Sequence, residues 1–322
     1  MNRKHVVLLG SAGTGTAFGA ACALRRAWSG RVQIVAMDIN PAHLVTTSLL
    51  SDLFRVVPPS SSSKFCEALQ TLLHECNVDT YLPLLPEEIV SSARLLKQNR
   101  LPEGLTLIAP SVESSQACAD KFQMFRVMQM QGLPVPRTYL GSDEACSGEV
   151  VVKPRSGSGS RGVKKLGVAS AIMSMGIQRD SWILQEVLDS PEVTVDAFYD
   201  PKKSYCAIVC RERLEIKSGV STKVRLFQSD AMRDLARSVA KTFSFTGSFC
   251  FQVMRGSEGW VIIDVNPRPG AATTTSLAAG NDFFSATFAL SWGEDYESFF
   301  RTLREEHFVT RQYSDFLMGK PE

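Results

Sequence analysis

Two neighbouring stretches decide the fold of this chain: GSFCFQV at residues 247–253 and WVIIDVNPR at residues 260–268. Alternating apolar residues run through both, and Gly-Ser-Glu-Gly at 256–259 lies between them. This pattern predicts two antiparallel strands joined by a tight turn. We expect Met254 to lie opposite Trp260 across that turn.

Three oxygen-bearing side chains, Gln252, Asp264 and Asn266, then share one face of the predicted hairpin. Oxygen ligands in small number suit Mg²⁺, which takes one or two protein carboxylates and completes its shell with water and substrate phosphates. Arg268 lies two residues after Asn266, and its planar guanidinium can donate two parallel hydrogen bonds to a carboxylate or phosphate. The alternative is an amphipathic surface strand whose polar face meets only water.

Upstream, the apolar strand EVVVKP at 149–154 leads into the Gly/Ser loop RSGSGSRG at 155–162. Such a loop lets a polyphosphate approach its backbone N–H groups, and Lys153, Arg155 and Arg161 supply positive charge. The stretch is not a P-loop, which needs Lys followed by Ser or Thr and then a helix. A flexible hairpin that binds no ligand is the alternative.

Two further strand-like runs follow, WILQEVL at 182–188 and EVTVDAF at 192–198, and Asp120-Lys121 precedes the whole set. Taken in this order, the motifs resemble the ATP-grasp superfamily. The likeness is greatest to its carbamoyl-phosphate-synthase-like branch of carboxylate–amine ligases, and it covers nearly the whole chain.

The resemblance implies a binding site for ATP. Lys121 and Lys153 would contact its phosphates, and Glu192 would lie at its ribose. The adenine would lie at Gln185, Glu186, Val187 and Leu188, and the loop that closes over the phosphates would comprise Ser156, Gly157, Ser158, Gly159, Ser160 and Gly162.

The resemblance also implies a metal site and a set of catalytic residues. Asp264 and Asn266, with Gln252 nearby, match the ligands of one or two Mg²⁺ ions, for which Mn²⁺ could substitute. Asp264 departs from the family, which usually has Glu there, and its shorter arm coordinates less readily through both oxygens. The catalytic residues would be Arg268, which also contacts the substrate, Arg211, Arg213 and Lys153.

The N-terminal residues predict a Rossmann-like domain. Apolar strands at 5–10 and 31–38 enclose a glycine-rich segment and a helix that runs through Trp28. This opening is also typical of nicotinamide-dependent oxidoreductases, the competing interpretation. However, the glycines at 10, 13, 15 and 19 do not fit Gly-x-Gly-x-x-Gly.

A predicted strand at 80–85 delivers Glu88 to its carboxyl end, where ligands collect in open α/β sheets. Glu88 is therefore a candidate for holding the amine of a substrate. The alternative is a glutamate that is favoured at a helix N-terminus by the helix dipole. Residues 111–131 are helical in pattern and carry Asp120-Lys121.

We therefore predict an α/β protein with α+β character in its C-terminal lobes. A pre-ATP-grasp, Rossmann-like substrate domain would occupy residues 1–110. The two-lobed ATP-grasp fold would follow, with a linker helix and small lid lobe at 111–188 and a large lobe holding the metal at 189–322.

Composition agrees with a folded enzyme, since 44% of the 322 residues are hydrophobic and 21% are charged. The formal net charge of +2 argues against a nucleic-acid partner. The apolar run after His5 is too short for a signal peptide or membrane span, so we expect a cytoplasmic protein with no membrane partner. Two amphipathic stretches at 292–322 fit either a terminal helix packed on its own domain or the surface of a homodimer.

The resemblance implies an ATP-dependent carboxylate–amine ligase that forms an amide or peptide bond through an acyl phosphate and releases ADP and phosphate. Its partners would be a small-molecule carboxylate and an amine, amino acids among them. Two alternatives stay open. One is a carbamoyl-phosphate-type or other small-molecule phosphoryl-transfer enzyme, and the other is a non-catalytic ATP-binding regulatory module.

Overall fold

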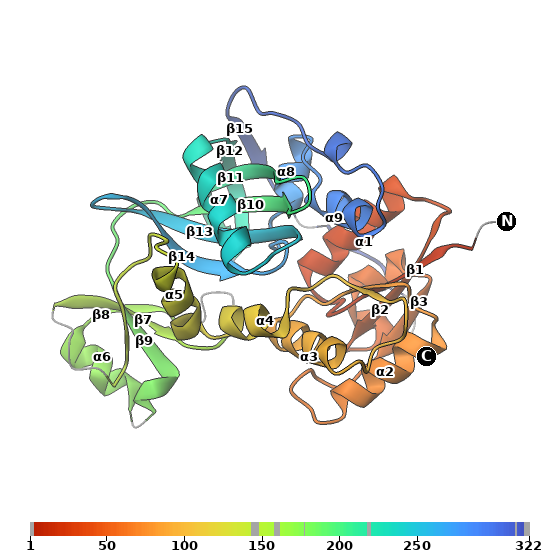
Figure 1. The fold of residues 1–322 in the computed structure, drawn as a ribbon, viewed down its shortest axis with the longest axis horizontal. Helices are drawn as coiled ribbons and strands as arrows, with labels where there is room; N and C mark the ends of the chain where they lie inside the picture. Colours follow the sequence, from red (N-terminus) through yellow and green to blue (C-terminus); the bar gives the residue numbers. More distant parts are fainter. Residues whose placement is uncertain are drawn as a thin grey trace.

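The computed structural model describes residues 3–142, 148–157, 162–176, 178–217, 220–312 and 314–318. Their strands form three sheets, of five, four and six strands. Figure 1 shows the N-terminal domain in red and orange, the small lobe in green, and the large lobe in cyan and blue above both. No helix in these residues is long and apolar enough to cross a membrane.

The N-terminal domain is built on a parallel sheet with the strand order β3-β2-β1-β4-β5. Val7 and Leu9 of β1 pack against α1, whereas Val6 and Leu8 pack against α2, which explains why this strand is apolar on both faces. The elements are β1 (His5–Leu9), α1 (Gly15–Ala27), β2 (Val32–Asp38), η1 (Ala42–Leu44), η2 (Thr46–Leu50), β3 (Leu53–Val56), α2 (Phe65–Glu75), β4 (Thr80–Leu82), α3 (Pro86–Lys97) and β5 (Thr106–Leu107).

Two helices, α4 (Val112–Ala119) and α5 (Lys121–Met130), replace the single helix that we expected at 111–131. The chain breaks at Asp120, which has extended backbone angles and caps α5 by accepting hydrogen bonds from the N–H groups of Phe122 and Gln123. Lys121 therefore opens a new helix.

The lid lobe, residues 138–186, is an antiparallel sheet with the strand order β6-β9-β7-β8. Its own core is small and consists of Val150, Val152, Ala171, Met175 and Leu184. The elements are β6 (Thr138–Leu140), β7 (Glu149–Pro154), β8 (Lys164–Gly167), α6 (Val168–Met175), η3 (Arg179–Ser181) and β9 (Trp182–Glu186).

The large lobe, residues 193–310, is an antiparallel sheet with the strand order β14-β13-β10-β11-β12-β15. Its elements are β10 (Val193–Asp200), β11 (Tyr205–Lys217), β12 (Val220–Phe227), α7 (Asp230–Thr242), β13 (Gly247–Gly256), β14 (Gly259–Asn266), α8 (Thr274–Ala278), α9 (Phe283–Ser291), η4 (Glu297–Phe299) and β15 (His307–Thr310). Of the two alternatives for 292–322, a terminal helix is not found in the described residues, where β15 instead adds to the sheet edge beside β12.

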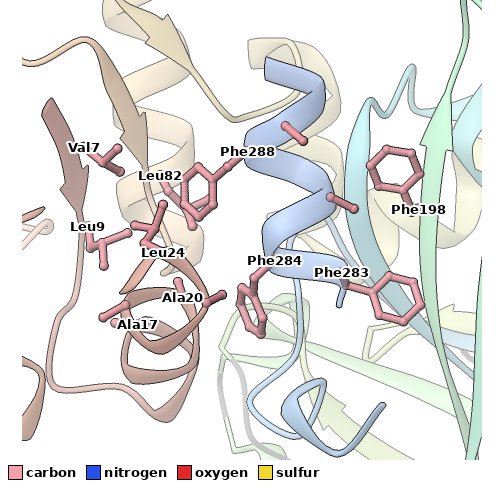
Figure 2. Packing of buried hydrophobic residues seen from close by; sticks show 14 of the residues in the cluster. Val7, Leu9, Ala17, Ala20, Leu24, Leu82, Phe198, Phe283, Phe284 and Phe288 are labelled. Atoms are coloured by element: carbon pink, nitrogen blue, oxygen red, sulfur yellow. The ribbon is translucent and has the colours of Figure 1, made fainter. Parts of the chain in front are cut away.

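The N-terminal domain and the large lobe share one hydrophobic core, with α9 between them (Figure 2). Phe284 and Phe288 point toward α1 and Leu82, and Phe283 points toward Phe198 of β10. Gly19 permits the close approach of α1, because a Cβ there would lie 2.6 Å from Thr274 and 3.3 Å from the Phe284 ring. Burial of this apolar surface fixes the N-terminal domain against the large sheet.

Candidate functional site

The hairpin of β13 and β14 has a register that differs by one residue from the expected one. Near the turn Met254 lies opposite Val261 rather than Trp260, in register with the pair Gly256 and Gly259. A β-bulge next to Val253 leaves Ile263 unpaired and shifts the register by one further residue. Beyond the bulge, Gln252 lies opposite Asp264 and Cys250 lies opposite Asn266.

The paired strands extend this row of polar side chains across the sheet. Thr194 of β10 is the ladder partner of both Gln252 and Arg211. Asp264, Gln252, Thr194 and Arg211 therefore lie side by side on four neighbouring strands, and all four line one cavity.

This cavity, of about 370 Å³, lies between the lid lobe and the large sheet and reaches Pro86 and Ile89 of α3. Its volume is within the range of small-molecule binding sites. The predicted residues that line it are Lys121, Lys153, Ser156, Gly157, Gln185, Glu186, Leu188, Glu192, Arg211, Arg213, Gln252, Asp264, Asn266 and Arg268. Glu88, Gly162 and Val187 do not line it, and Ser158, Gly159 and Ser160 lie outside the described residues.

Two lysines enter the cavity from the lid side. Burial lowers the pKa of Lys153, at the end of β7, and the negative charge of Asp264 partly opposes this shift. Lys121 Nζ donates a hydrogen bond to the carbonyl oxygen of Gly157, 2.8 Å away. The backbone next to Lys121 is also fixed, because the preceding residue, Asp120, forms an ion pair with Arg155. The two ammonium groups suit the phosphates of a nucleotide.

The segment that follows β9 forms another wall of the cavity. Gln185 is buried and donates a hydrogen bond to Thr138 Oγ1, 2.8 Å away. The carboxylate of Glu186 accepts hydrogen bonds from the backbone N–H and the Nε of Arg137, at 3.0 and 2.9 Å. Strand β9 ends at Glu186, so the backbone near Leu188 leaves the sheet where it meets the cavity.

Asp264, Asn266 and Gln252 present oxygen atoms in the middle of the cavity. Asn266 Nδ2 donates to Asp264 Oδ2 at 3.0 Å, and Gln252 Nε2 donates to Glu192 Oε1 at 2.7 Å. Each amide nitrogen is bound to a carboxylate, so the amide oxygen is the atom of each side chain that would serve as a ligand. One carboxylate and two amide oxygens fit Mg²⁺ that is completed by water and phosphates.

The described residues contain no cluster of three or more His, Cys, Asp or Glu side chains that could hold a metal.

The three arginines of the site differ in their partners. Arg211 is buried against Asp196, with Nε 2.7 Å from Oδ2. Arg213 Nη1 lies 2.5 Å from Glu192 Oε1, and its Nε donates to Ser221 Oγ at 3.0 Å. Arg268 forms no ion pair with a described residue and donates to the carbonyl of Pro269 at 2.8 Å. Its positive charge is therefore the least compensated of the three.

Glu88 does not line the cavity, although Pro86 and Ile89 of the same helix do, and its carboxylate is hydrogen-bonded inside the N-terminal domain. It is 2% exposed and accepts hydrogen bonds from Tyr81 Oη, Ser11 Oγ and the N–H groups of Leu84 and Leu85. Burial raises its pKa, although these hydrogen bonds oppose the shift. The geometry thus favours the helix-terminus alternative over contact with a substrate amine.

Sequence reasoning left several cavity residues unassigned. Thr194 lines the cavity, the buried Asp196 follows it on β10, and Glu192 immediately precedes that strand, so the three residues alternate in the sequence. That alternation was the available signal. Cys118 and Cys250 also line the cavity, and burial raises the pKa of the Cys250 thiol to about 12. No pattern in the sequence distinguishes these two cysteines from the others.

Comparison with known proteins gives a family-model match to an ATP-grasp domain over residues 118–272. No curated protein matches the chain. N5-carboxyaminoimidazole synthetase from Staphylococcus aureus, complexed with ADP, has a similar structure, with a TM-score of 0.74, 13% identity, and coverage of 92% of this chain and 79% of that one.

Two other solved structures are similar over most of the chain. L-amino acid ligase from Bacillus licheniformis has a TM-score of 0.72 and 11% identity, covering 93% of this chain and 77% of that one. The biotin carboxylase domain dimer of Hydrogenobacter thermophilus 2-oxoglutarate carboxylase, in complex with MgADP, ADP and bicarbonate, has a TM-score of 0.70 and 15% identity. The match covers 95% of this chain and 72% of that one. The predicted fold class is confirmed, and residues 118–272 match the family model of an ATP-grasp domain.

Proposed function

We propose that the chain is an ATP-dependent, ADP-forming ligase that joins a small-molecule carboxylate to an amine. One observation carries this proposal: Lys121, Lys153, Asp264, Asn266 and Arg268 line a single cavity in an ATP-grasp fold. An amino acid is the first substrate class to test, because one similar structure is an L-amino acid ligase.

The reaction begins when a carboxylate oxygen of the substrate attacks the γ-phosphorus of ATP. The bond from that phosphorus to the β,γ-bridging oxygen breaks, which gives an acyl phosphate and ADP. The amine then attacks the acyl carbon, the bond from that carbon to the phosphate oxygen breaks, and the nitrogen loses a proton as inorganic phosphate leaves. Such phosphoryl transfer depends mainly on positioning and on neutralising charge.

Each group of the cavity has a role in this scheme. Lys121 and Lys153 hold the phosphates, and Arg268 faces the transferred phosphoryl group. Asp264, Asn266 and Gln252 would hold Mg²⁺, which withdraws charge from the phosphate oxygens when bound. The cavity lies beneath the lid lobe, which would exclude water from the acyl phosphate. The number of ions, a cytoplasmic location and a homodimer stay predictions.

The test is release of ADP from MgATP by the purified protein, with amino acids offered singly and in pairs. Hydroxylamine replaces the amine in a parallel assay, because it traps an acyl phosphate as a hydroxamate. We expect ADP release with two substrates, and hydroxamate when one carboxylate is present. Lys153→Ala and Asp264→Ala should abolish both signals.

The matched control is Lys165→Ala, because Lys165 lies on β8 in the same lobe, does not line the cavity, and pairs with Glu149 at the surface. It should retain activity. A phosphorylated product that accumulates without an amine would favour the phosphoryl-transfer alternative. Tight ATP binding without turnover across all pools would favour the regulatory module.

A further inference from the structure

Asp196 of β10 is a fully buried carboxylate for which the scheme above has no use. It is 0% exposed and lies behind the cavity rather than in its lining. It accepts four hydrogen bonds: from Arg211 Nε at 2.7 Å, Arg211 Nη2 at 3.0 Å, Thr273 Oγ1 at 2.7 Å and Ser276 Oγ at 2.7 Å. A buried carboxylate with this many donors is rigidly held.

The partners of Asp196 lead to the cavity in two directions. Arg211 lines it directly, beside Thr194 in the polar row of the sheet. Thr273 Oγ1 also accepts a hydrogen bond from the N–H of Gly270, 2.8 Å away. Residues 270–272 form a wall of the cavity. The carboxylate of Asp196 therefore holds both Arg211 and, through Thr273, this wall of the cavity.

The opposite charges of Arg211 and Asp196 explain why the two side chains are held in a single geometry. Burial alone lowers the pKa of Arg211, but the charge and hydrogen bonds of Asp196 more than reverse this, so the guanidinium stays protonated. A bidentate pair fixes the plane of the guanidinium. Removing one partner of a buried pair leaves an uncompensated charge, which is strongly unfavourable.

We propose that Asp196 is a positioning residue for the substrate end of the cavity: it holds Arg211 and the 270–276 segment in the geometry that the acyl transfer needs. This proposal rests on the proposed function. The ATP end depends on Lys121, Lys153 and the β9 segment, none of which contacts Asp196 in the described structure. Loss of Asp196 should therefore impair chemistry and substrate binding more than ATP binding.

The test compares Asp196→Asn with Asp200→Asn. Asp200 is a second buried carboxylate of β10, held by Tyr296 Oη at 2.5 Å, and it does not line the cavity. We expect Asp196→Asn to lower kcat about 100-fold while the Kd for ATP changes less than about threefold. Asp200→Asn should lower Tm and leave kcat and the substrate KM unchanged.

A second readout does not depend on turnover. The Cys250 Sγ lies 3.3 Å from the position of a Cβ on Gly270, so it reports on the wall. Labelling of Cys250 by a maleimide, followed by mass spectrometry, should be faster in Asp196→Asn than in wild type or Asp200→Asn. This result stands even if the chain proves not to be a ligase.

If Asp196→Asn does not fold, Thr273→Val combined with Ser276→Ala removes the two hydroxyl hydrogen bonds to Asp196 and the hydrogen bond from the Gly270 N–H to Thr273, and it leaves the ion pair. This variant should raise the substrate KM about tenfold and speed the labelling of Cys250. The proposal would be overturned if the folded variants kept the kcat, the substrate KM and the rate of Cys250 labelling of the wild type. Equal kinetic losses in Asp196→Asn and Asp200→Asn would also overturn it, because the effect would then be one of stability alone.

Discussion

At the scale of single residues, burial decides what the acidic side chains can do. The carboxylate of Glu88 accepts hydrogen bonds from donors of its own domain. In Glu88→Gln, the amide Oε1 can accept the bonds that Glu88 Oε2 now accepts, and the amide Nε2 can donate to Tyr81 Oη. We therefore expect Glu88→Gln to retain kcat and the amine KM within about threefold. Glu88→Ala leaves buried donors unpaired and should cost about 3 kcal/mol. An amine KM that rises at least tenfold in Glu88→Gln would instead assign Glu88 to the substrate.

The pH dependence of stability tests Glu88 in a second way. Its folded-state pKa is raised above the ordinary 4.5, so the folded protein keeps a proton that the unfolded chain releases. The contribution of Glu88 is therefore fully present below pH 4.5 and is lost as pH rises through the raised pKa. Urea unfolding of wild type and Glu88→Gln between pH 4 and pH 8 should diverge across that interval. Parallel curves would contradict the raised pKa.

Lys153 illustrates a conflict between stability and binding. Its pKa is lowered chiefly by burial, so the charged form destabilises the ligand-free protein. We expect Lys153→Met to raise the free energy of unfolding by about 1 kcal/mol and Tm by roughly 2–4 °C. The same change should remove the rise in Tm that MgATP causes in wild type. Differential scanning calorimetry with and without MgATP measures both effects.

Lys165→Met is the control for this experiment, because its side chain is 51% exposed. Its stability should stay within about 0.5 kcal/mol of wild type and its response to MgATP should persist. A wild-type response to MgATP in Lys153→Met would place the nucleotide phosphates elsewhere.

At the scale of the elements, local patterns of apolar residues in the sequence predicted the strands correctly. The alternation in 247–268 gave the hairpin, and the apolar run after His5 gave the first parallel strand, because these patterns reflect which faces are buried. The bulge at Ile263 and the break at Asp120 were missed. The bulge concerns how β13 pairs with β14, and Asp120 caps α5 and pairs with Arg155; apolar periodicity reports neither feature.

The partners of the site arginines could not be predicted for a related reason. Asp196 and Arg211 are 15 residues apart and meet only because β10 and β11 pair in a particular register. Side-chain alternation puts Arg211 and Arg213 on one face of their strand, but it does not predict which carboxylate each of them contacts. The candidate residues could be named from sequence, whereas their charge balance required the structure.

Helix α9 provides the element-scale prediction, because its phenylalanines join two domains. Phe284→Ala and Phe288→Ala should each cost about 3–5 kcal/mol, the usual range for emptying a buried aromatic site. Phe308→Ala on β15 is the control, since Phe308 is 70% exposed and should cost under about 0.5 kcal/mol. Urea denaturation gives all three values. Equal costs at Phe284 and Phe308 would mean that α9 does not anchor the domains.

At the scale of the whole molecule, the hydrophobic cores predict how the chain unfolds. One core joins β1 and α1 to β10 and α9, so the N-terminal domain and the large lobe should unfold together. The lid lobe has a much smaller core of its own, around Val152 and Leu184. A small core stabilises less, so the lid lobe should open at a lower urea concentration.

Native tryptophans allow a direct test of this order. Trp28 lies in the shared core, Trp260 packs on the large lobe and Trp182 packs on the core of the lid lobe. Three single-tryptophan variants, with the other tryptophans changed to Phe, are followed by fluorescence in urea. Trp28 and Trp260 should report one midpoint, and Trp182 should report a lower one that MgATP raises toward the other two, because the nucleotide would contact both lobes. Separate midpoints for Trp28 and Trp260 would show that the shared core does not couple the two domains.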